Sequence, residues 1–433
     1  MLRPGIGCLP LPQVRGPFRL APERVKTLSN ATQCELQQCP PSQPDAPMTE
    51  FAAVHTTAKD AATAAGDLAS QITAKLQGRP DVLLVFASSA YDSIALLEGL
   101  QAAVAPGILV GASSAGEFTH GNAGVGSASA LAIRSSDLKF AVGIGHGVSR
   151  DGRNAAREVI SGFQGLDSEY PYRAALIMSD ALAGHAEALV EELTLRTAGR
   201  YVLAGGGAGD DAQFARTHVF VGTEAHNDAA VGLEILSHKP IGVGVGHGWE
   251  PAGPALRATE VDGLRLIGLN GQPAIEAFEA HAAQAGKSFR HDDPMPYFLH
   301  NILGIATGDG YRLRVPLAVH EDGSITCAAE IPEHAQVHIM NTSNQSATQA
   351  AARATDKALS ALEGHAPGAA LFFDCVATRL RLGEDFAYEL GTVVERLGPA
   401  QMVGCNTYGQ IARAEGQFSG FHNCTAVVLV IAD

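Results

Sequence analysis

The chain has 433 residues, 46% of them hydrophobic, and this length suffices for two or three domains, of which we expect two. A formal net charge of -15 leaves no basic surface for phosphates, so nucleic acid is not expected as a partner. The longest apolar stretches, such as 426–432, fall far short of the ~20 residues of a membrane helix. This predicts a soluble protein without a membrane partner. The seven cysteines form no Cys-x-x-Cys pair and no zinc pattern, so we expect reduced thiols in a cytoplasmic protein.

Residues 1–47 are predicted to be a disordered, proline-rich extension. They contain nine prolines and show neither helical nor alternating hydrophobic periodicity. They also lack the continuous apolar segment of a secretory signal, and Met48 is a candidate for the true start. Residues 48–80 are predicted to hold an N-terminal helix over 56–77, because apolar residues recur there at helical spacing and a Gly-Arg-Pro sequence follows.

Residues 81–262 form the predicted first α/β domain. Short apolar runs alternate there with helical patterns, which is typical of strand-helix-strand units. The predicted elements are strands at 82–86, 108–110, 129–134 and 138–144, helices at 92–104 and 154–161, and a hairpin that pairs 217–221 with 229–236.

Residues 263–433 form the predicted second α/β domain. It opens with a helix from 271–278, where a proline in the first turn costs no hydrogen bond. The other predicted elements are strands at 310–317, 324–328, 336–339 and 425–431 and a long helix at 344–362.

The same pattern recurs three times along the chain. Apolar runs at 81–87, 174–178 and 369–373 are each followed by a helix, a second strand and a small-residue turn, at 111–117, 205–211 and 404–410. The string Gly-x-Gly-His-Gly also occurs twice, ending at Gly147 and at Gly248. Self-similarity of this kind predicts an α/β fold of two domains, in which internally duplicated strand-helix-strand units form layered mixed sheets covered by helices.

Five motifs in this order resemble the FIST family, and the resemblance covers roughly 82–429. The motifs are Ser113–Glu117, Gly205–Asp211 with Thr217–Gly222, Leu269–Ala274, Asn406–Ile411 and His422–Thr425. The resemblance implies an N-terminal and a C-terminal FIST domain that together act as a sensory, small-ligand-binding module. Such modules are often fused to histidine kinases, chemoreceptors or cyclic-dinucleotide enzymes. One bacterial branch, the NosP-like proteins, binds haem and senses nitric oxide through a partner kinase.

The chain departs from the family pattern in two ways. Family members commonly carry Glu in the last turn, where this sequence has Gln410, which puts an acidic contact there in doubt. No output domain is recognised, so the signal is expected to pass to a separate protein such as a histidine kinase, and an oligomer is compatible with this reading.

The three turns are the predicted ligand site. Glycines at the carboxyl ends of strands let backbone N–H groups approach a ligand, and open α/β sheets bind ligands at those ends. The candidate ligand-binding residues are Ser113, Ser114, Glu117, Asp210, Asp211, Asn406, Tyr408, His422 and Asn423. The alternative is that the glycines only permit tight turns and that the Ser and Asp residues cap the following helices. None of the turns has the spacing of a nucleotide fingerprint or of a nucleophile elbow.

Two further hypotheses stay open. The NosP-like resemblance makes haem a candidate cofactor, with His146, His247 or His422 as its axial ligand, since a neutral imidazole binds haem iron. Each of these residues is also compatible with a plain surface or hydrogen-bonding role. The second alternative is a hydrolase or transferase in which Cys405 or Ser113 is the nucleophile and His422 the base.

Overall fold

The computed structural model describes residues 49–308, 310–414 and 420–433. The predicted disordered extension, 1–47, lies outside these ranges. Within them, the mixed α/β fold with layered sheets and covering helices is confirmed, and no helix is long and apolar enough to cross a membrane.

The first repeat, unit 1, differs from the sequence prediction at its start. Residues 49–56 form a strand that pairs along its whole length with 128–135, and the helix begins only at Ala61, where the Asp60 side chain accepts from the N–H of Thr63 at 2.9 Å. The predicted helix over 56–77 was therefore too long at its start. The elements of unit 1 are β1 (Thr49–Thr56), α1 (Ala61–Lys75), β2 (Val82–Ser88), α2 (Ser93–Val104), β3 (Ile108–Ser114), β4 (Glu117–Thr119), β5 (Ala123–Gly124) and β6 (Ala128–Ser135).

Unit 2 repeats this order and corrects a second prediction. The expected hairpin of 217–221 with 229–236 does not form, because the intervening residues 224–226 make their own strand against 219–221. Residues 229–237 pair instead with two other strands of their own unit. The elements are β7 (Lys139–His146), α3 (Gly152–Ser161), β8 (Tyr172–Ser179), η1 (Ala181–Ala183), α4 (Ala186–Arg196), β9 (Val202–Gly207), β10 (Val219–Val221), β11 (Glu224–His226) and β12 (Ala229–Ser237).

Unit 3 is interrupted by an insertion of about one hundred residues between its first strand and its first helix. Its own elements are β13 (Ile241–Gly246), α7 (Asn344–Ser360), β23 (Pro367–Cys375), α8 (Val376–Leu382), η2 (Gly383–Asp385), α9 (Phe386–Leu397), β24 (Gln401–Thr407), β25 (Gln410–Arg413), β26 (Gly420–His422) and β27 (Ala426–Ala432).

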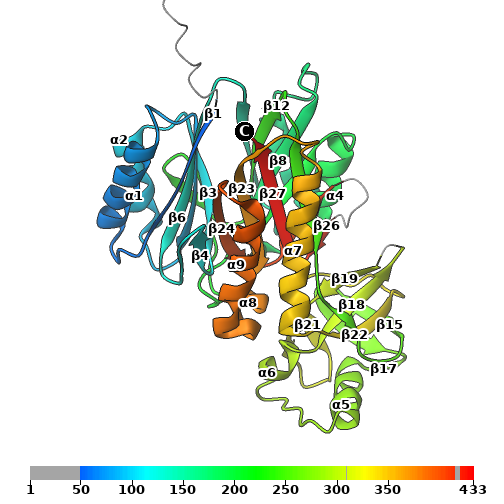
Figure 1. Cartoon of the computed structure of the whole chain (residues 1–433). Coiled ribbons are helices and arrows are strands. Elements are labelled where there is room, and N and C mark those ends of the chain that lie inside the picture. The colour runs from blue at the N-terminus through cyan, green and yellow to red at the C-terminus, as the bar shows by residue number, and fades with distance from the viewer. Residues whose placement is uncertain (1–48, 309, 415–419) are drawn as a thin grey trace, which may run out of the picture. The chain divides into compact units, whose positions relative to one another are not determined.

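The insertion builds a separate antiparallel sheet, seen beside α7 in Figure 1. The predicted strand at 310–317 is two strands, because Pro316 cannot donate to a continuous ladder. The predicted domain boundary at 262/263 falls in the turn between two paired strands of the insertion. The elements are β14 (Glu250–Pro251), β15 (Leu256–Asp262), β16 (Arg265–Leu269), β17 (Gln272–Pro273), α5 (Ala274–Gln284), α6 (Met295–Phe298), β18 (Ile302–Thr307), β19 (Gly310–Arg314), β20 (Pro316–Val319), β21 (Ile325–Cys327) and β22 (Gln336–Asn341).

The three units interlock by exchanging hairpins. Their sheets have one common order: β1-β6-β2-β3-β10-β11, β7-β12-β8-β9-β25-β26 and β13-β27-β23-β24-β4-β5. In each sheet the third and fourth strands are parallel and the last two come from another unit: unit 2 completes the sheet of unit 1, unit 3 that of unit 2, and unit 1 that of unit 3. The exchange holds the ends of β3, β9 and β24 together.

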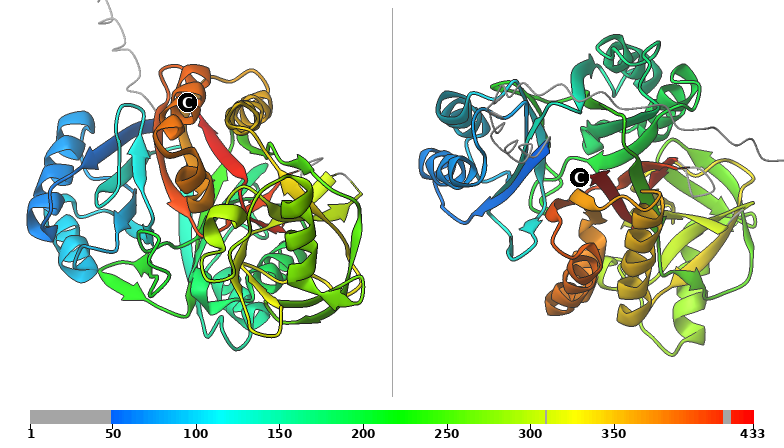
Figure 2. Two further views of the ribbon diagram at one scale, coloured as in Figure 1. Left: turned by 90° about the horizontal axis from the view of Figure 1, so that it is seen from below. Right: turned by 45° about the horizontal axis from the view of Figure 1, so that its top comes forward.

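The sheets face one another through a shared core, and the helices cover their outer faces. Leu84, Leu176 and Leu371 hold equivalent positions on the three parallel pairs and belong to one buried cluster. Their chain neighbours point the opposite way, as strand geometry requires, and pack under the helices of each unit. Figures 1 and 2 show α1 and α2 on the outside of the first sheet and α7 and α9 on the outside of the third.

The repeated Gly-x-Gly-His-Gly string has a packing role. A Cβ at Gly143 in β7 would lie 1.9 Å from the carbonyl oxygen of Val159, and one at Gly244 in β13 would lie 1.7 Å from that of Ala354. These glycines therefore let α3 and α7 rest directly on their strands.

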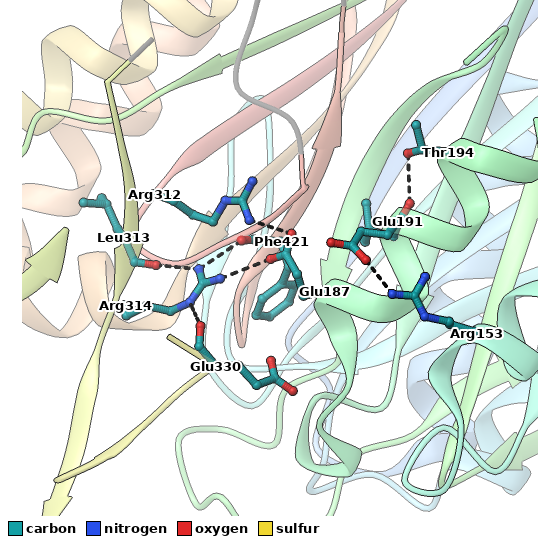
Figure 3. A network of polar contacts seen from close by, with 10 residues as sticks. Arg153, Glu187, Glu191, Thr194, Arg312, Leu313, Arg314, Glu330 and Phe421 are labelled. Carbon is teal, nitrogen blue, oxygen red and sulfur yellow. Dashed lines mark hydrogen bonds and ion pairs between the residues drawn. The ribbon is translucent and has the colours of Figure 1, made fainter. Parts of the chain in front are cut away.

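A buried arginine anchors the insertion to the repeats (Figure 3). The guanidinium of Arg314, at the end of β19, forms an ion pair with Glu187 of α4 at 3.1 Å and donates to the carbonyl of Phe421 at 3.1 Å. Arg312 reaches the other oxygen of Glu187 at 2.7 Å. The insertion is thus tied to unit 2 and to the last hairpin by a single charged network.

Candidate functional site

The three small-residue segments are strand ends rather than turns. β3 continues to Ser114, β9 to Gly207 and β24 to Thr407, so the chain turns about three residues later than predicted. The reason is close packing between parallel neighbours, since a Cβ at Gly111 would lie 1.8 Å from the carbonyl oxygen of Val85. Gly205 lies equally close to its neighbouring strand. The small residues therefore have a packing role within the sheets.

Just beyond these strand ends, the three units meet. The N–H of Gly209 donates to the carbonyl of Ser113 at 2.9 Å, and the N–H of Tyr408 donates to that of Gly207 at 2.9 Å. Asn406 donates its N–H to Gly116 at 2.8 Å. We call residues 113–117, 207–211 and 406–410 the central junction. The structure thus brings residues of all three predicted turns together.

Glu117 is a fully buried carboxyl in the junction. One oxygen accepts from the hydroxyl of Ser114 at 2.6 Å, and the other accepts from the hydroxyl of Ser127 at 2.7 Å and from its N–H at 3.2 Å. Burial raises the pKa of Glu117 to about 7, against the lowering effect of these hydrogen bonds. The group therefore titrates near neutral pH.

Gln410 occupies the position in unit 3 that Glu117 holds in unit 1. Its amide nitrogen donates to the hydroxyl of Thr407 at 2.9 Å, and its amide oxygen accepts from the N–H of Thr425 at 3.2 Å. These are the counterparts of two of the three hydrogen bonds made by Glu117, since the hydroxyl of Thr425 donates to the carbonyl of Asn423 instead. The departure from the family pattern at this position thus removes a charge and keeps two hydrogen bonds.

The two aspartates of the junction differ. Asp210 accepts from the backbone N–H groups of 214, 215 and 216 and from the hydroxyl of Tyr408, so it organises the loop that follows β9. Asp211 accepts from the hydroxyls of Ser88 and Ser89 through one oxygen, at 2.7 and 2.8 Å. Its other oxygen is buried and has no hydrogen-bond partner among the described residues.

The remaining predicted residues make structural contacts. Ser113 accepts from the N–H of His218 at 2.9 Å. The amide oxygen of Asn423 accepts from the N–H of Val315 at 3.3 Å, which links the last hairpin to the insertion. Burial, with Arg312 and Arg314 nearby, holds the pKa of His422 well below its usual range, so this imidazole is neutral.

Arg379 of α8 is the residue that the sequence analysis missed. Its Nε and both polar atoms of the Asn406 side chain are buried without a hydrogen-bond partner in the described parts of the chain. Burial lowers the pKa of Arg379, while the nearby Glu117 and Asp211 raise it. In the sequence, Arg379 is marked as a site residue only by its position four residues beyond the end of β23. This signal is weak, because arginines on helices usually face solvent.

Arg379 and Asn406 lie at a cavity of about 470 Å³, which we call the junction pocket. One wall is the β4–β5 hairpin, with Phe118, and the other is α9, with Phe386 and Leu390. A concave, largely apolar cavity with a few convergent polar groups is the usual form of a small-molecule site. Asn406 is the one predicted ligand-binding residue that lines it.

Tyr408 and Asn423 line a different cavity of about 160 Å³ on the other side of α8. The predicted site residues are therefore divided among the two cavities, the central junction and strand β26, which holds His422.

The three haem candidates do not fit a haem site in this structure. His146 is exposed at the end of β7, and His247 lies beside a cavity of only about 10 Å³, with its Nε2 3.1 Å from the carbonyl oxygen of Tyr311. His422 is packed near two arginines. None of the three lines either larger cavity described above, and the described residues contain no cluster of three or more His, Cys, Asp or Glu side chains suited to a metal ion.

Cys405, one of the two proposed nucleophiles, lies where its reactive thiolate form is disfavoured. Cys405 is fully buried in the shared core, and burial raises its pKa well above the ordinary value for a thiol. It lies opposite Glu117 in the β4–β24 ladder, whereas His422 lies opposite Gln410 in another sheet. The structure gives the nucleophile hypothesis no support.

The chain is thus a mixed α/β protein of interlocked sheets, with a polar-ended cavity where the strand ends of its repeats meet. It belongs to the FIST family: residues 81–272 match the FIST N domain and residues 274–413 match the FIST C domain. FIST domains are associated with small-ligand sensing in signal transduction.

Two solved structures show a distant likeness to this chain. One is a cyanuric acid hydrolase, described as an evolutionary innovation by structural concatenation, with 10% identity and a TM-score of 0.30 over 89% of this chain and 100% of that one. Another is phosphoribosylformylglycinamidine synthase II from Thermotoga maritima, with 10% identity and a TM-score of 0.21 over 88% and 71%. Likenesses at this level carry no conclusion. A search of curated protein sequences finds no match.

Proposed function

We propose that this protein is a cytoplasmic sensor that binds a small molecule in the junction pocket and reports its occupancy to a separate partner such as a histidine kinase. Membership of the FIST family supports the sensory role. One observation carries the choice of site: Arg379 and Asn406, which line a cavity of about 470 Å³, have buried polar atoms with no hydrogen-bond partner among the described residues.

Unpartnered buried polar groups are costly, and a ligand can remove that cost. Each such group costs roughly 1–3 kcal/mol, and native structures contain few of them. Arginine offers donors only, whereas an asparagine amide both donates and accepts. A ligand with both an oxygen acceptor and an O–H or N–H donor would satisfy Arg379 and both polar atoms of Asn406. Its apolar part would pack against Phe118 and Leu390.

The walls of the junction pocket suggest how occupancy becomes a signal. The β4–β5 hairpin belongs to unit 1, while α8 and α9 belong to unit 3. A ligand that contacts both walls would favour one spacing between the hairpin and the helices over others. The exposed surface of α9, where the side chain of Tyr388 is 71% exposed, would carry that change to a partner.

The test is a thermal-shift screen with small organic acids and neutral metabolites, followed by calorimetry on the ligands that stabilise the protein. Arg379→Met keeps the apolar stem of the side chain and removes its donors. We expect this variant to bind the ligand ~10- to 100-fold more weakly, which corresponds to the free energy of one hydrogen bond to a charged group. Arg290→Met is the control, because Arg290 is exposed and its guanidinium pairs with the exposed Asp292, away from the junction pocket. Equal affinity in both variants, or no stabilising ligand at all, would contradict the proposal. Ligand-dependent autophosphorylation of a co-purifying kinase tests the partner.

A further inference from the structure

The cavity on the far side of α8 has a different chemistry from the junction pocket. It lies between the insertion and the repeats, with a volume of about 160 Å³, and we call it the apolar pocket. Its walls include Val315, Leu317 and Cys327 from the insertion and Val376, Ala377 and Leu380 from α8.

The polar side chains at its edge are already satisfied. The hydroxyl of Tyr408 donates to Asp210, and the amide of Asn423 bonds to Val315 N–H at 3.3 Å and to the carbonyl of His422 at 3.3 Å. The apolar pocket therefore offers a ligand contact area but few free hydrogen-bonding groups. A charged or strongly polar ligand would lose its hydration there without compensation.

The size and one wall of the apolar pocket suit a ring. Its volume of about 160 Å³ resembles that of the ~150 Å³ engineered apolar cavity that stays dry and binds benzene. The rings of Phe214 and Tyr408 stack at 4.4 Å, with 15° between their planes, and form an aromatic wall. Aromatic faces stack readily on a further ring.

The mouth of the apolar pocket is marked by exposed apolar side chains. Leu182, Phe214 and Leu380 line the cavity and are 42%, 44% and 43% exposed. They come from three separate segments of the chain, so their clustering results from the fold and not from one apolar stretch of sequence. Clustered exposed apolar side chains at a cavity are typical of ligand entrances.

We infer that the apolar pocket is a second ligand site, which takes one aromatic ring or a short branched hydrocarbon group of a neutral small molecule. This inference goes beyond the proposed function and does not depend on any ligand of the junction pocket.

Indole is the probe for a calorimetric test. We expect saturable binding of one indole per chain, at least tenfold weaker in Ala328→Leu and in Ala377→Leu, which fill the cavity from its opposite walls. Ala103→Leu makes the same chemical change on the exposed face of α2 and should leave binding unchanged. Saturable binding that neither filling variant weakens, or none up to the solubility limit of indole, overturns the inference.

Crystals of the unaltered protein soaked with 5-bromoindole give a second readout that needs no variant. The anomalous signal of bromine in the apolar pocket supports the inference. A signal only elsewhere, or no signal, overturns it.

Discussion

The two cavities that flank α8 are opposites in chemistry although they share one helix of seven residues. On one side, α8 presents Arg379 to the junction pocket, where the Asn406 amide also has no hydrogen-bond partner in the described parts of the chain. On the other, it presents Val376 and Leu380 to the apolar pocket, where the polar groups are paired. The difference follows from the origin of the opposing walls. The repeats alone build the junction pocket, and the insertion closes the apolar pocket.

This difference implies that the apolar pocket depends on how firmly the insertion is held. The Arg314 network in Figure 3 joins the insertion to unit 2, whereas no described residue of the insertion lines the junction pocket. A substitution that breaks the Arg314 network should therefore weaken ligand binding in the apolar pocket and leave binding in the junction pocket unchanged.

The largest expected effect comes from Glu187→Ala. Arg314 is 1% exposed, so removing its ion-pair partner leaves a buried charge uncompensated and should cost about 3–5 kcal/mol of unfolding free energy. Burial lowers the pKa of Arg314, because the charged guanidinium loses its hydration in the interior. Urea denaturation measures the loss. Indole binding should weaken with it, while ligand binding in the junction pocket persists.

Glu191→Ala is the matched control on the same helix. Glu191 pairs with Arg153 at 2.8 Å, and both side chains are about half exposed, so its loss should change stability by less than ~1 kcal/mol. Similar losses in the two variants would show that the anchor contributes no more than a surface ion pair.

The next effect concerns pH and the Glu117 carboxyl beside the junction pocket. Its pKa is raised from 4.5 to about 7 in the folded protein, so the folded state holds the proton more tightly than the unfolded state. This contribution to stability is fully present below pH 4.5 and is lost as the pH rises to about 7, by on the order of 3 kcal/mol.

Glu117→Gln should abolish that loss, because an amide does not titrate. Gln410 shows that an amide at the equivalent position makes two of the corresponding hydrogen bonds. Urea denaturation at pH 5 and pH 8 is the measurement, and the variant should gain stability relative to the unaltered protein between these values. Glu389, whose pKa burial also raises to about 7, titrates in both proteins and cancels in the difference. Parallel pH profiles would contradict the assignment to Glu117.

Much of the fold could be predicted because local signals carry it. The central strands β2, β8 and β23 are apolar runs, and Asp92 and Asp151 cap α2 and α3 with their side chains. The exchanged hairpins could not be predicted, since strands of two to four residues pair there with strands of another unit. β1 was missed because its partner, β6, follows about eighty residues later.

For the candidate site, the sequence predicted the meeting of the strand ends but not the cavities. Parallel strands in repeated units place their carboxyl ends alike, and this rule brought Glu117, Asp211 and Asn406 into one set. Which side chains stay unpartnered depends on packing between units. Arg379 and the division into two cavities are therefore visible only in the structure.

The smallest expected effect is a coupling between the two cavities through α8. A ligand that draws Arg379 toward the junction pocket should shift the short helix away from the insertion and loosen the contacts that Leu380 and Val376 make with a ring. We expect indole to bind about fivefold more weakly when the junction pocket is saturated, at the low end of the usual 1–3 kcal/mol of coupling.

Calorimetric titration of indole with and without the junction ligand measures this factor, and the reverse titration must return the same value. Arg379→Met should bind indole with an affinity that the junction ligand no longer changes. Equal indole affinities in the free and saturated protein would show that α8 separates the two sites without linking them.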